Sequence, residues 1–314
     1  MDKQVMTTDF FEKQNVIYNS IALRRKELMG IAILSVILYH WFSWCKYGYL
    51  DMFHYLYIGV DVFLLLSGFG LCFSYNKCNL PRFYRRRLLR VFPLFVVFNL
   101  FLFLVSKDGF DLKEFISVCT TMEFYNLHSS SKEWYISAIL LLYLLFPLFY
   151  RYTNNLSVTV LTLAIFPVTL FIPLDWRHDC LISRIPIFMY GILIYKIHKL
   201  EKLPYSPFVI IIFLSVGLMT FFLCQSSSLL TAMFCPVVLF FLSKLLGNTP
   251  SRALDYLGTH SLELFLSNGF IGYFICGPLK DLRPFLLVAV YWLLQMVFGI
   301  LFIAIGKITN KYLT

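Results

Sequence analysis

The chain is poor in charged residues, which make up 14% of its 314 positions, against about 25% in soluble domains. Hydrophobic residues make up 59% and aromatic residues 19%. This balance excludes an ordinary soluble domain and predicts a polytopic membrane protein. Residues 1–27 are polar and lack the pattern of a secretory signal peptide, so we expect the first span to be retained.

Cysteine motifs are also lacking. The eight cysteines are scattered, with no CxxC and no Cys/His spacing suited to a metal, so we expect no disulfide framework and no metal site. A basic domain is lacking too, because the net charge of +10 comes from residues at the ends of apolar segments. This placement is typical of membrane orientation and argues against nucleic-acid binding.

The apolar runs predict an all-α protein with ten membrane spans. Of the 27 Lys and Arg residues, 19 fall in segments that face the cytoplasm if both termini are cytoplasmic. We therefore expect a cytoplasmic segment 1–27, a membrane domain 28–305 and a cytoplasmic tail 306–314. The expected spans are 28–46, 54–75, 88–105, 134–150, 156–173, 185–198, 206–224, 229–246, 256–276 and 284–305.

Two ionisable residues, His40 and Asp61, stand inside the first two apolar runs. A charged group there costs roughly 2.5–3.5 kcal/mol by insertion scales, so it needs a partner or a function. His40 lies six residues and Asp61 seven residues from the outer end of its span, which predicts similar depths and a His–Asp pair. Such a pair suits removal of a proton from a hydroxyl. The alternative is a structural pair that locks two helices.

A basic stripe precedes the third span. Arg82, Arg86 and Arg90 recur every four residues on one helical face, flanked by Arg85 and Arg87. Arginine binds phosphate through two parallel hydrogen bonds, so the stripe predicts a polyphosphate site. Topology alone, with arginine heads reaching lipid phosphates, is the alternative.

Further candidates lie near these groups. Ser67-Gly68-Phe69-Gly70 would allow close helix packing or a narrow passage. Glu133, Trp134 and Arg184 stand at expected outer ends, where they would anchor the protein at the interface or bind substrate. Glu263 and Asn268 lie in the ninth span, where hydrogen bonds between helices are the simpler interpretation.

Six motifs in order resemble the acyltransferase-3 family of integral-membrane O-acyltransferases. They are ELMGIAILSVILYH, GVDVFLLLSGFG, FYRRRLLRVFP, EWYISAILLLYLLFP, RIPIFMYGILI and LGTHSLELFLS. The resemblance implies ten helices and transfer of an acyl group from cytoplasmic acyl-CoA to a hydroxyl of a glycan or lipid-linked sugar. It implies catalytic roles for His40, Asp61 and Ser67, and donor binding by Arg85, Arg86, Arg87 and Arg90.

The chain departs from the family pattern at two positions. Met29 stands where many members have an arginine, and Arg25, one turn earlier, would cover that role. Asn268 stands where the late family motif has a histidine. Both departures bear on the geometry of the donor side, and an altered acyl donor or a diverged subfamily would explain them.

The resulting hypothesis is an O-acetyltransferase of the bacterial inner membrane, using acetyl-CoA and a cell-surface polysaccharide or lipid-linked glycan. A glycan-lipid flippase with His40 and Asp61 as a proton relay is the main alternative. A glycan polymerase is a weaker one, because its long arginine-rich outer loops are missing. The sequence does not indicate the oligomeric state.

Overall fold

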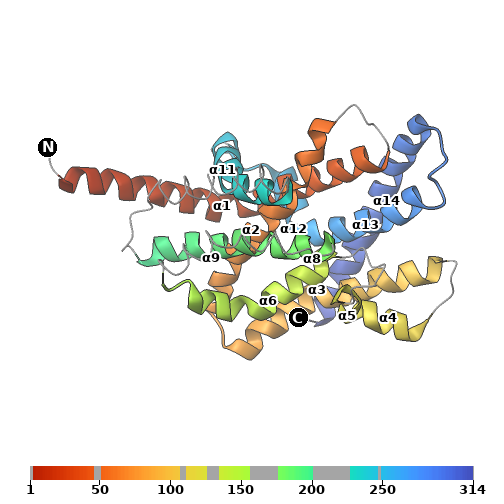
Figure 1. Cartoon of the computed structure of the whole chain (residues 1–314), viewed down its shortest axis with the longest axis horizontal. Coiled ribbons are helices and arrows are strands. Elements are labelled where there is room, and N and C mark those ends of the chain that lie inside the picture. The colour runs from red at the N-terminus through yellow and green to blue at the C-terminus, as the bar shows by residue number, and fades with distance from the viewer. Residues whose placement is uncertain are drawn as a thin grey trace.

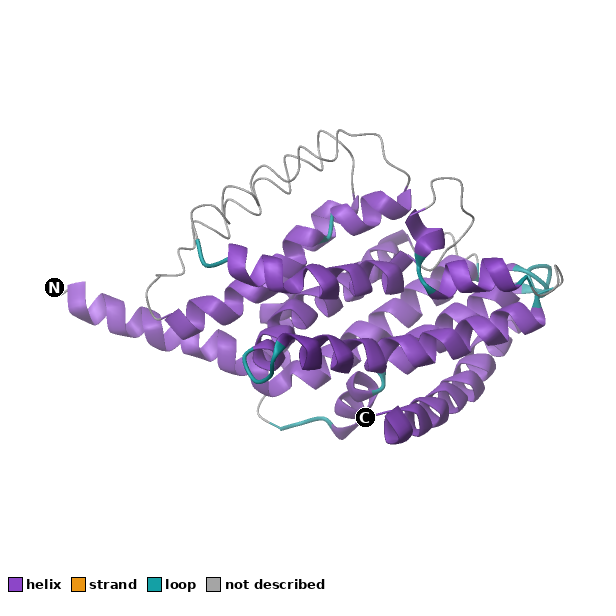
Figure 2. Cartoon of the chain, turned by 90° about the horizontal axis from the view of Figure 1, so that it is seen from below, coloured by secondary structure: helices purple, strands orange, loops and turns teal. Residues whose placement is uncertain are grey.

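A computed structural model describes residues 3–45, 51–106, 111–125, 134–155, 176–200, 227–246 and 249–313. Within these residues the chain forms helices and no strands (Figures 1 and 2). The expected spans 156–173 and 206–224 lie outside them. The helices are α1 (Lys3–Trp44), η1 (Asp51–Tyr57), α2 (Ile58–Tyr75), α3 (Leu80–Val105), α4 (Leu112–Cys119), α5 (Met122–Tyr125), α6 (Trp134–Tyr152), α8 (Trp176–Ile182), α9 (Ile185–Leu200), α11 (Ser227–Leu245), α12 (Arg252–Thr259), α13 (Ser261–Cys276) and α14 (Pro284–Leu313).

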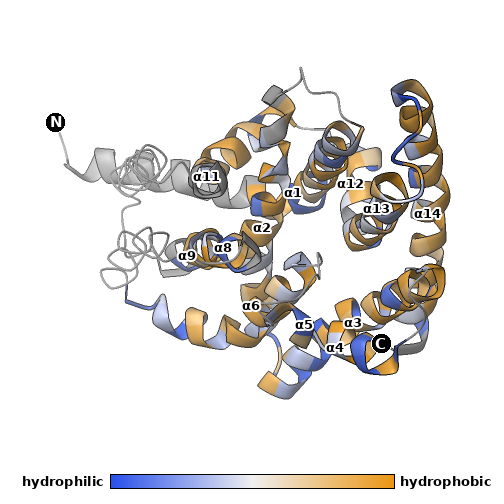
Figure 3. Ribbon diagram, turned by 45° about the vertical axis from the view of Figure 1, so that its right-hand side comes forward, coloured by the Kyte–Doolittle hydropathy of each residue, from blue (hydrophilic) through white to orange (hydrophobic). Residues whose placement is uncertain are grey.

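Among the described residues, four helical segments are long and apolar enough to cross a membrane: Tyr55–Tyr75, Leu80–Val105, Trp134–Tyr152 and Pro284–Thr309. Large apolar side chains such as Leu144, Leu148 and Ile300 are exposed on their outer faces, and α14 is apolar along most of its length (Figure 3). Exposed apolar helix faces of this kind suit a hydrocarbon surrounding. The chain is therefore a multi-pass membrane protein, while the number of ten spans and the orientation stay predictions.

Helices α1 and α2 pack antiparallel, and their register sets the depth of the candidate residues. Phe42 stacks on Phe53 of η1 with ring centroids 4.2 Å apart. A Cβ at Gly59 would contact Ala32 and Val36. Asp61 therefore lies level with about residue 32 of α1, eight residues or ~12 Å deeper than His40. The expectation of equal depth is wrong, because the 3-10 helix η1 carries the chain down beside α1 before α2 begins.

The expected span 256–276 is broken into two helices. His260 separates α12 from α13 with φ −104° and ψ 23°. Helix α12 packs backbone to backbone on α1, where Gly30 lies against Leu254 and Gly258 against Lys26. Helix α13 continues between α1 and α14, and its buried Glu263 lies 3.8 Å from Nδ1 of His260.

Candidate active site

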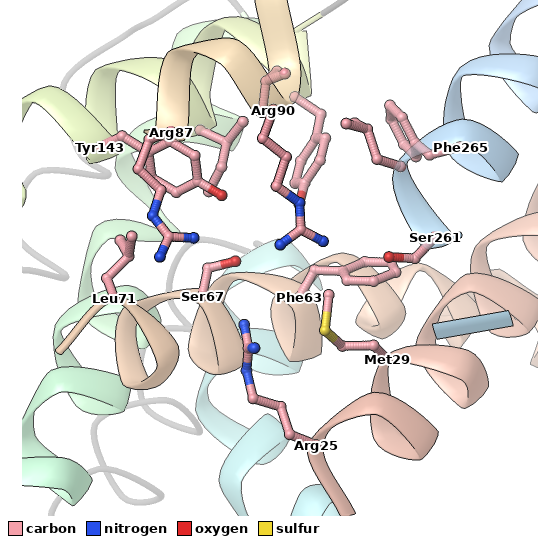
Figure 4. A pocket seen from close by; sticks show the side chains of 14 residues that line it. Arg25, Met29, Phe63, Ser67, Leu71, Arg87, Arg90, Tyr143, Ser261 and Phe265 are labelled. Atoms are coloured by element: carbon pink, nitrogen blue, oxygen red, sulfur yellow. The ribbon is translucent and has the colours of Figure 1, made fainter. Parts of the chain in front are cut away.

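One pocket brings together three arginines from two helices that are far apart in the sequence. Arg25 reaches it from α1, while Arg87 and Arg90 reach it from α3, and their guanidinium groups converge around Ser67 of α2 (Figure 4). The empty volume is about 630 Å³, including the open mouth. The other lining residues are Met29, Phe63, Leu71, Val91, Tyr135, Ile139, Tyr143, Ser261, Leu262 and Phe265.

The face that α3 turns inward decides which arginines enter the pocket. Phe83, Val91 and Leu94 are buried on that face, and the helical period places Arg87 and Arg90 beside them. Arg90 is exposed and Arg87 is half-buried, but both line the pocket. The remaining candidates of the predicted stripe are exposed and do not line it; these are Arg82, Arg85 and Arg86. The pocket thus separates two arginines from the larger set that the sequence suggests.

Arg25 is held in place by α2. Its Nε donates a hydrogen bond to the carbonyl oxygen of Leu66 at 3.1 Å, and its guanidinium lies against Gly70. Burial, followed by the charge of Arg90, lowers the pKa of Arg25 to about 10, so the group remains charged at neutral pH. The buried Nε of Arg87 has no hydrogen-bond partner among the described residues. A pocket with three cations and an unsatisfied N–H suits a polyanionic ligand.

His40 lies in a second cluster, farther along α1. Its Nδ1 is 2.5 Å from Oδ1 of Asn268 on α13, and its ring stacks on Trp44 with centroids 4.4 Å apart. The amide nitrogen of Asn268 donates to the hydroxyl of Tyr291 at 2.7 Å and to Oε1 of Gln295 at 3.0 Å. The side chain of His40 is half-buried. Its hydrogen bond to Asn268 uses the Nδ1 atom.

Asp61 has a different partner from the one expected. Its Oδ1 lies 3.0 Å from Nε of Arg184, and both side chains are buried. Arg184 also donates to the carbonyl oxygen of Cys180 at 3.1 Å. Its guanidinium lies 5.0 Å from the ring centre of Trp134 and 5.7 Å from that of Tyr57. The predicted contact between His40 and Asp61 is therefore wrong, and Asp61 joins Arg184 and Trp134 instead.

The remaining candidates are distributed between these clusters. Ser67 lines the arginine pocket, at the level of Arg25, rather than lying beside His40. Glu133 lies outside the described residues. Sequence reasoning missed Tyr291 and Gln295, although Gln295 is a polar residue within an apolar stretch of α14 and could have been noticed on that ground.

Comparison with known proteins gives one match. The acyltransferase-3 family model, described as an acyltransferase domain, matches residues 28–308. Neither curated proteins nor solved structures gave a match.

Proposed function

The chain belongs to the acyltransferase-3 family, and we propose that it transfers an acetyl group from cytoplasmic acetyl-CoA to a hydroxyl of a surface polysaccharide or lipid-linked glycan. In this proposal the protein lies in the bacterial inner membrane with both termini in the cytoplasm. The observation that carries the proposal is that one face of α13 borders both the arginine pocket and His40.

That face is defined by four residues. Ser261 and Phe265 line the arginine pocket, Asn268 contacts His40, and Gly272 lies against Trp44. Their spacing of four, three and four residues places them in one row along the helix. The pocket and His40 thus lie along one face of α13, which in this proposal is the path of the donor.

The length of this route fits the donor. Eleven residues separate Met29 in the pocket from His40, which is ~16 Å of helix. A pantetheine arm extends to ~15–20 Å at the reach of an extended chain. With its phosphates held by Arg25, Arg87 and Arg90, the donor would present its thioester near His40.

His40 would then act as the general base. It accepts the proton of the acceptor hydroxyl as the oxygen attacks the thioester carbonyl, a C–O bond forms and the C–S bond breaks. The proton returns from the imidazolium to the departing CoA sulfur. The products are the acylated glycan and free CoA, with His40 restored to its neutral form.

The acceptor would enter from the opposite side of the membrane from the donor. Trp134 and Arg184 lie together where α6 begins and just before α9, and Trp134 presents an aromatic surface suited to sugar rings. Contacts of Glu133 and Trp134 with the glycan belong to the same proposal.

The flippase alternative is not favoured. A direct proton relay needs His40 and Asp61 in contact, whereas Asp61 is paired with Arg184 and lies ~12 Å deeper than His40.

The test is acyl transfer by purified protein in nanodiscs. Acetyl-CoA labelled in the acetyl group is supplied with a lipid-linked glycan fraction, and both free CoA and labelled glycan are measured. We expect both to form in equal amounts with wild type. Absence of CoA release and of donor binding would overturn the acyltransferase proposal and make the flippase the favoured function.

A further inference from the structure

Building on the proposed function, we propose that Asn268 is the positioning residue of His40. It holds the imidazole in the tautomer that carries hydrogen on Nδ1, which leaves the lone pair of Nε2 for the acceptor hydroxyl. The proposal rests on the direction of each hydrogen bond in the cluster formed by His40, Asn268, Tyr291, Gln295 and Ser267.

Tyr291 fixes the orientation of the Asn268 amide. The hydroxyl of Tyr291 donates its one hydrogen to the carbonyl oxygen of Ile37 at 2.9 Å, and that carbonyl oxygen is only an acceptor. The Tyr291 oxygen must therefore accept a hydrogen from Asn268, 2.7 Å away. This requires the amide nitrogen, not the amide oxygen, on the side of Tyr291.

Gln295 agrees with this orientation. Its Oε1 accepts the second amide hydrogen of Asn268 at 3.0 Å, and its Nε2 donates to the hydroxyl of Ser267 at 3.2 Å. Ser267 in turn donates to the carbonyl oxygen of Leu264 at 2.9 Å. Both hydrogens of the Asn268 amide are thus used, and its oxygen faces His40.

The orientation of Asn268 determines the tautomer of His40. An amide oxygen can only accept, so Nδ1 of His40 must donate across the 2.5 Å contact. In neutral imidazole the other nitrogen, Nε2, is then the acceptor. Asn268 is fully buried and Tyr291 is 0% exposed, so this network is shielded from water.

Trp44 of α1 fixes the plane of the ring, and α13 leaves the space in which Trp44 lies. Trp44 stacks on His40 with an angle of 7° between the rings. A Cβ at Gly272 would lie 2.5 Å from the Trp44 ring, so only glycine leaves room for Trp44 in this place. Asn268 and Gly272 are four residues apart on one helix face. Asn268 holds the ring at its edge, and Gly272 leaves room for Trp44 against its face.

The tautomer can be observed directly in histidine labelled with ¹⁵N. Spectra of wild type in proteoliposomes are compared with Asn268→Leu, and the His40→Gln spectrum assigns the His40 signals among the six histidines. We expect His40 to carry hydrogen on Nδ1 in wild type. In Asn268→Leu we expect the signal to move to the Nε2-protonated form or to a mixture.

Kinetics separate positioning from a general effect on folding. For Asn268→Leu we expect kcat to fall about 10²-fold, the size of a general-base contribution, with KM for acetyl-CoA changed less than about threefold. Asn99→Leu is the matched control, since Asn99 is similarly buried and, among the described residues, its side-chain hydrogen bond goes to Phe95 in its own helix. It should leave kcat, KM and the His40 spectrum unchanged.

Because Asn268→Leu could fail to fold, Asn268→Gln and Tyr291→Phe are measured in parallel. We expect Asn268→Gln to restore part of kcat and the Nδ1-protonated signal. Tyr291→Phe removes the group that orients the amide and should lower kcat by about three- to tenfold, the value of one neutral hydrogen bond.

A wild-type His40 without hydrogen on Nδ1, or an unchanged spectrum in Asn268→Leu and Tyr291→Phe, would overturn the proposal. The spectra require no turnover, so the two proposals can fail separately. A wild type that releases no CoA would contradict the acyltransferase proposal, while the spectra would still decide whether Asn268 sets the tautomer of His40.

Discussion

The guanidinium of Arg25 lies against Gly70, where a Cβ would stand 2.5 Å from Nη2 of the arginine. A methyl group there meets the far end of a flexible side chain. At Gly68, two residues earlier, a methyl group would instead meet the carbonyl oxygen of Phe188 in α9. The two glycines of the Ser67–Gly70 motif therefore have separate tasks.

Gly70→Ala should move Arg25 out of the pocket and weaken acyl-CoA binding by roughly tenfold, the lower value for a charge-assisted contact. Thermal stability should change little. Gly68→Ala should lower thermal stability because backbone atoms of α9 have to move. Binding calorimetry and thermal unfolding in detergent measure both effects. Equal losses of stability in the two variants would contradict this division.

The arginine pocket predicts different kinetic effects for neighbouring arginines of α3. Arg87→Ala and Arg90→Ala should each raise KM for acetyl-CoA by roughly ten- to a hundredfold, with a smaller change in kcat. Arg86→Ala, on the exposed face of the same helix, should change KM less than about threefold. Steady-state kinetics decide the matter. A larger effect at Arg86 than at Arg87 would favour the surface stripe over the pocket.

The lowered pKa of Arg25, about 10, predicts a pH dependence of phosphate binding. The positive charge is complete at pH 8 and is lost as the pH rises through 10, and at pH 10.5 about a quarter of the groups remain charged. Affinity for adenosine 3′,5′-bisphosphate, whose phosphates do not titrate in this range, should fall about fourfold from pH 8 to 10.5. Arg25→Gln should bind more weakly at pH 8 and lack this step. If Arg25→Gln showed the same fall in affinity between pH 8 and 10.5, the titrating group would be a residue other than Arg25.

The buried pair of Asp61 and Arg184 predicts coupling in stability. Asp61→Asn leaves the buried Arg184 without its opposite charge, and breaking such a pair costs about 3–5 kcal/mol. Arg184→Gln should be similarly harmful, while the double variant should recover part of the loss. Thermal unfolding of the four proteins provides the double-mutant cycle. Additive losses in the double variant would show that the two residues act independently.

His40→Ala should lower kcat for acyl transfer by about 10²- to 10⁴-fold while acetyl-CoA affinity stays within about threefold of wild type. The reason is that His40 lies outside the arginine pocket. Labelled glycan and donor binding are measured on the same preparation. Wild-type rates in this variant would remove His40 from the mechanism.

The sequence predicted the helical membrane architecture and the family, and it singled out His40 and the arginine-rich segment. The partner of His40 was not predictable from local pattern, because Asn268 is 228 residues away and the depth of α2 depends on the length of η1. The selection of Arg87 and Arg90 as the pocket arginines of α3 could more easily have been predicted. The buried positions Phe83, Val91 and Leu94 mark the inner face of α3, and that pattern is already present in the sequence.

The row of residues along α13 has a mechanical consequence. Ser261 and Phe265 border the arginine pocket, while Asn268 contacts His40 and Gly272 contacts its stacking partner Trp44. A rigid helix cannot turn at one end only, so a rotation of α13 about its axis displaces the pocket wall and the imidazole support by the same angle. In the proposed mechanism, donor binding at this wall and the orientation of the His40 ring would therefore change together, because both contacts belong to one helix that begins after the break at His260.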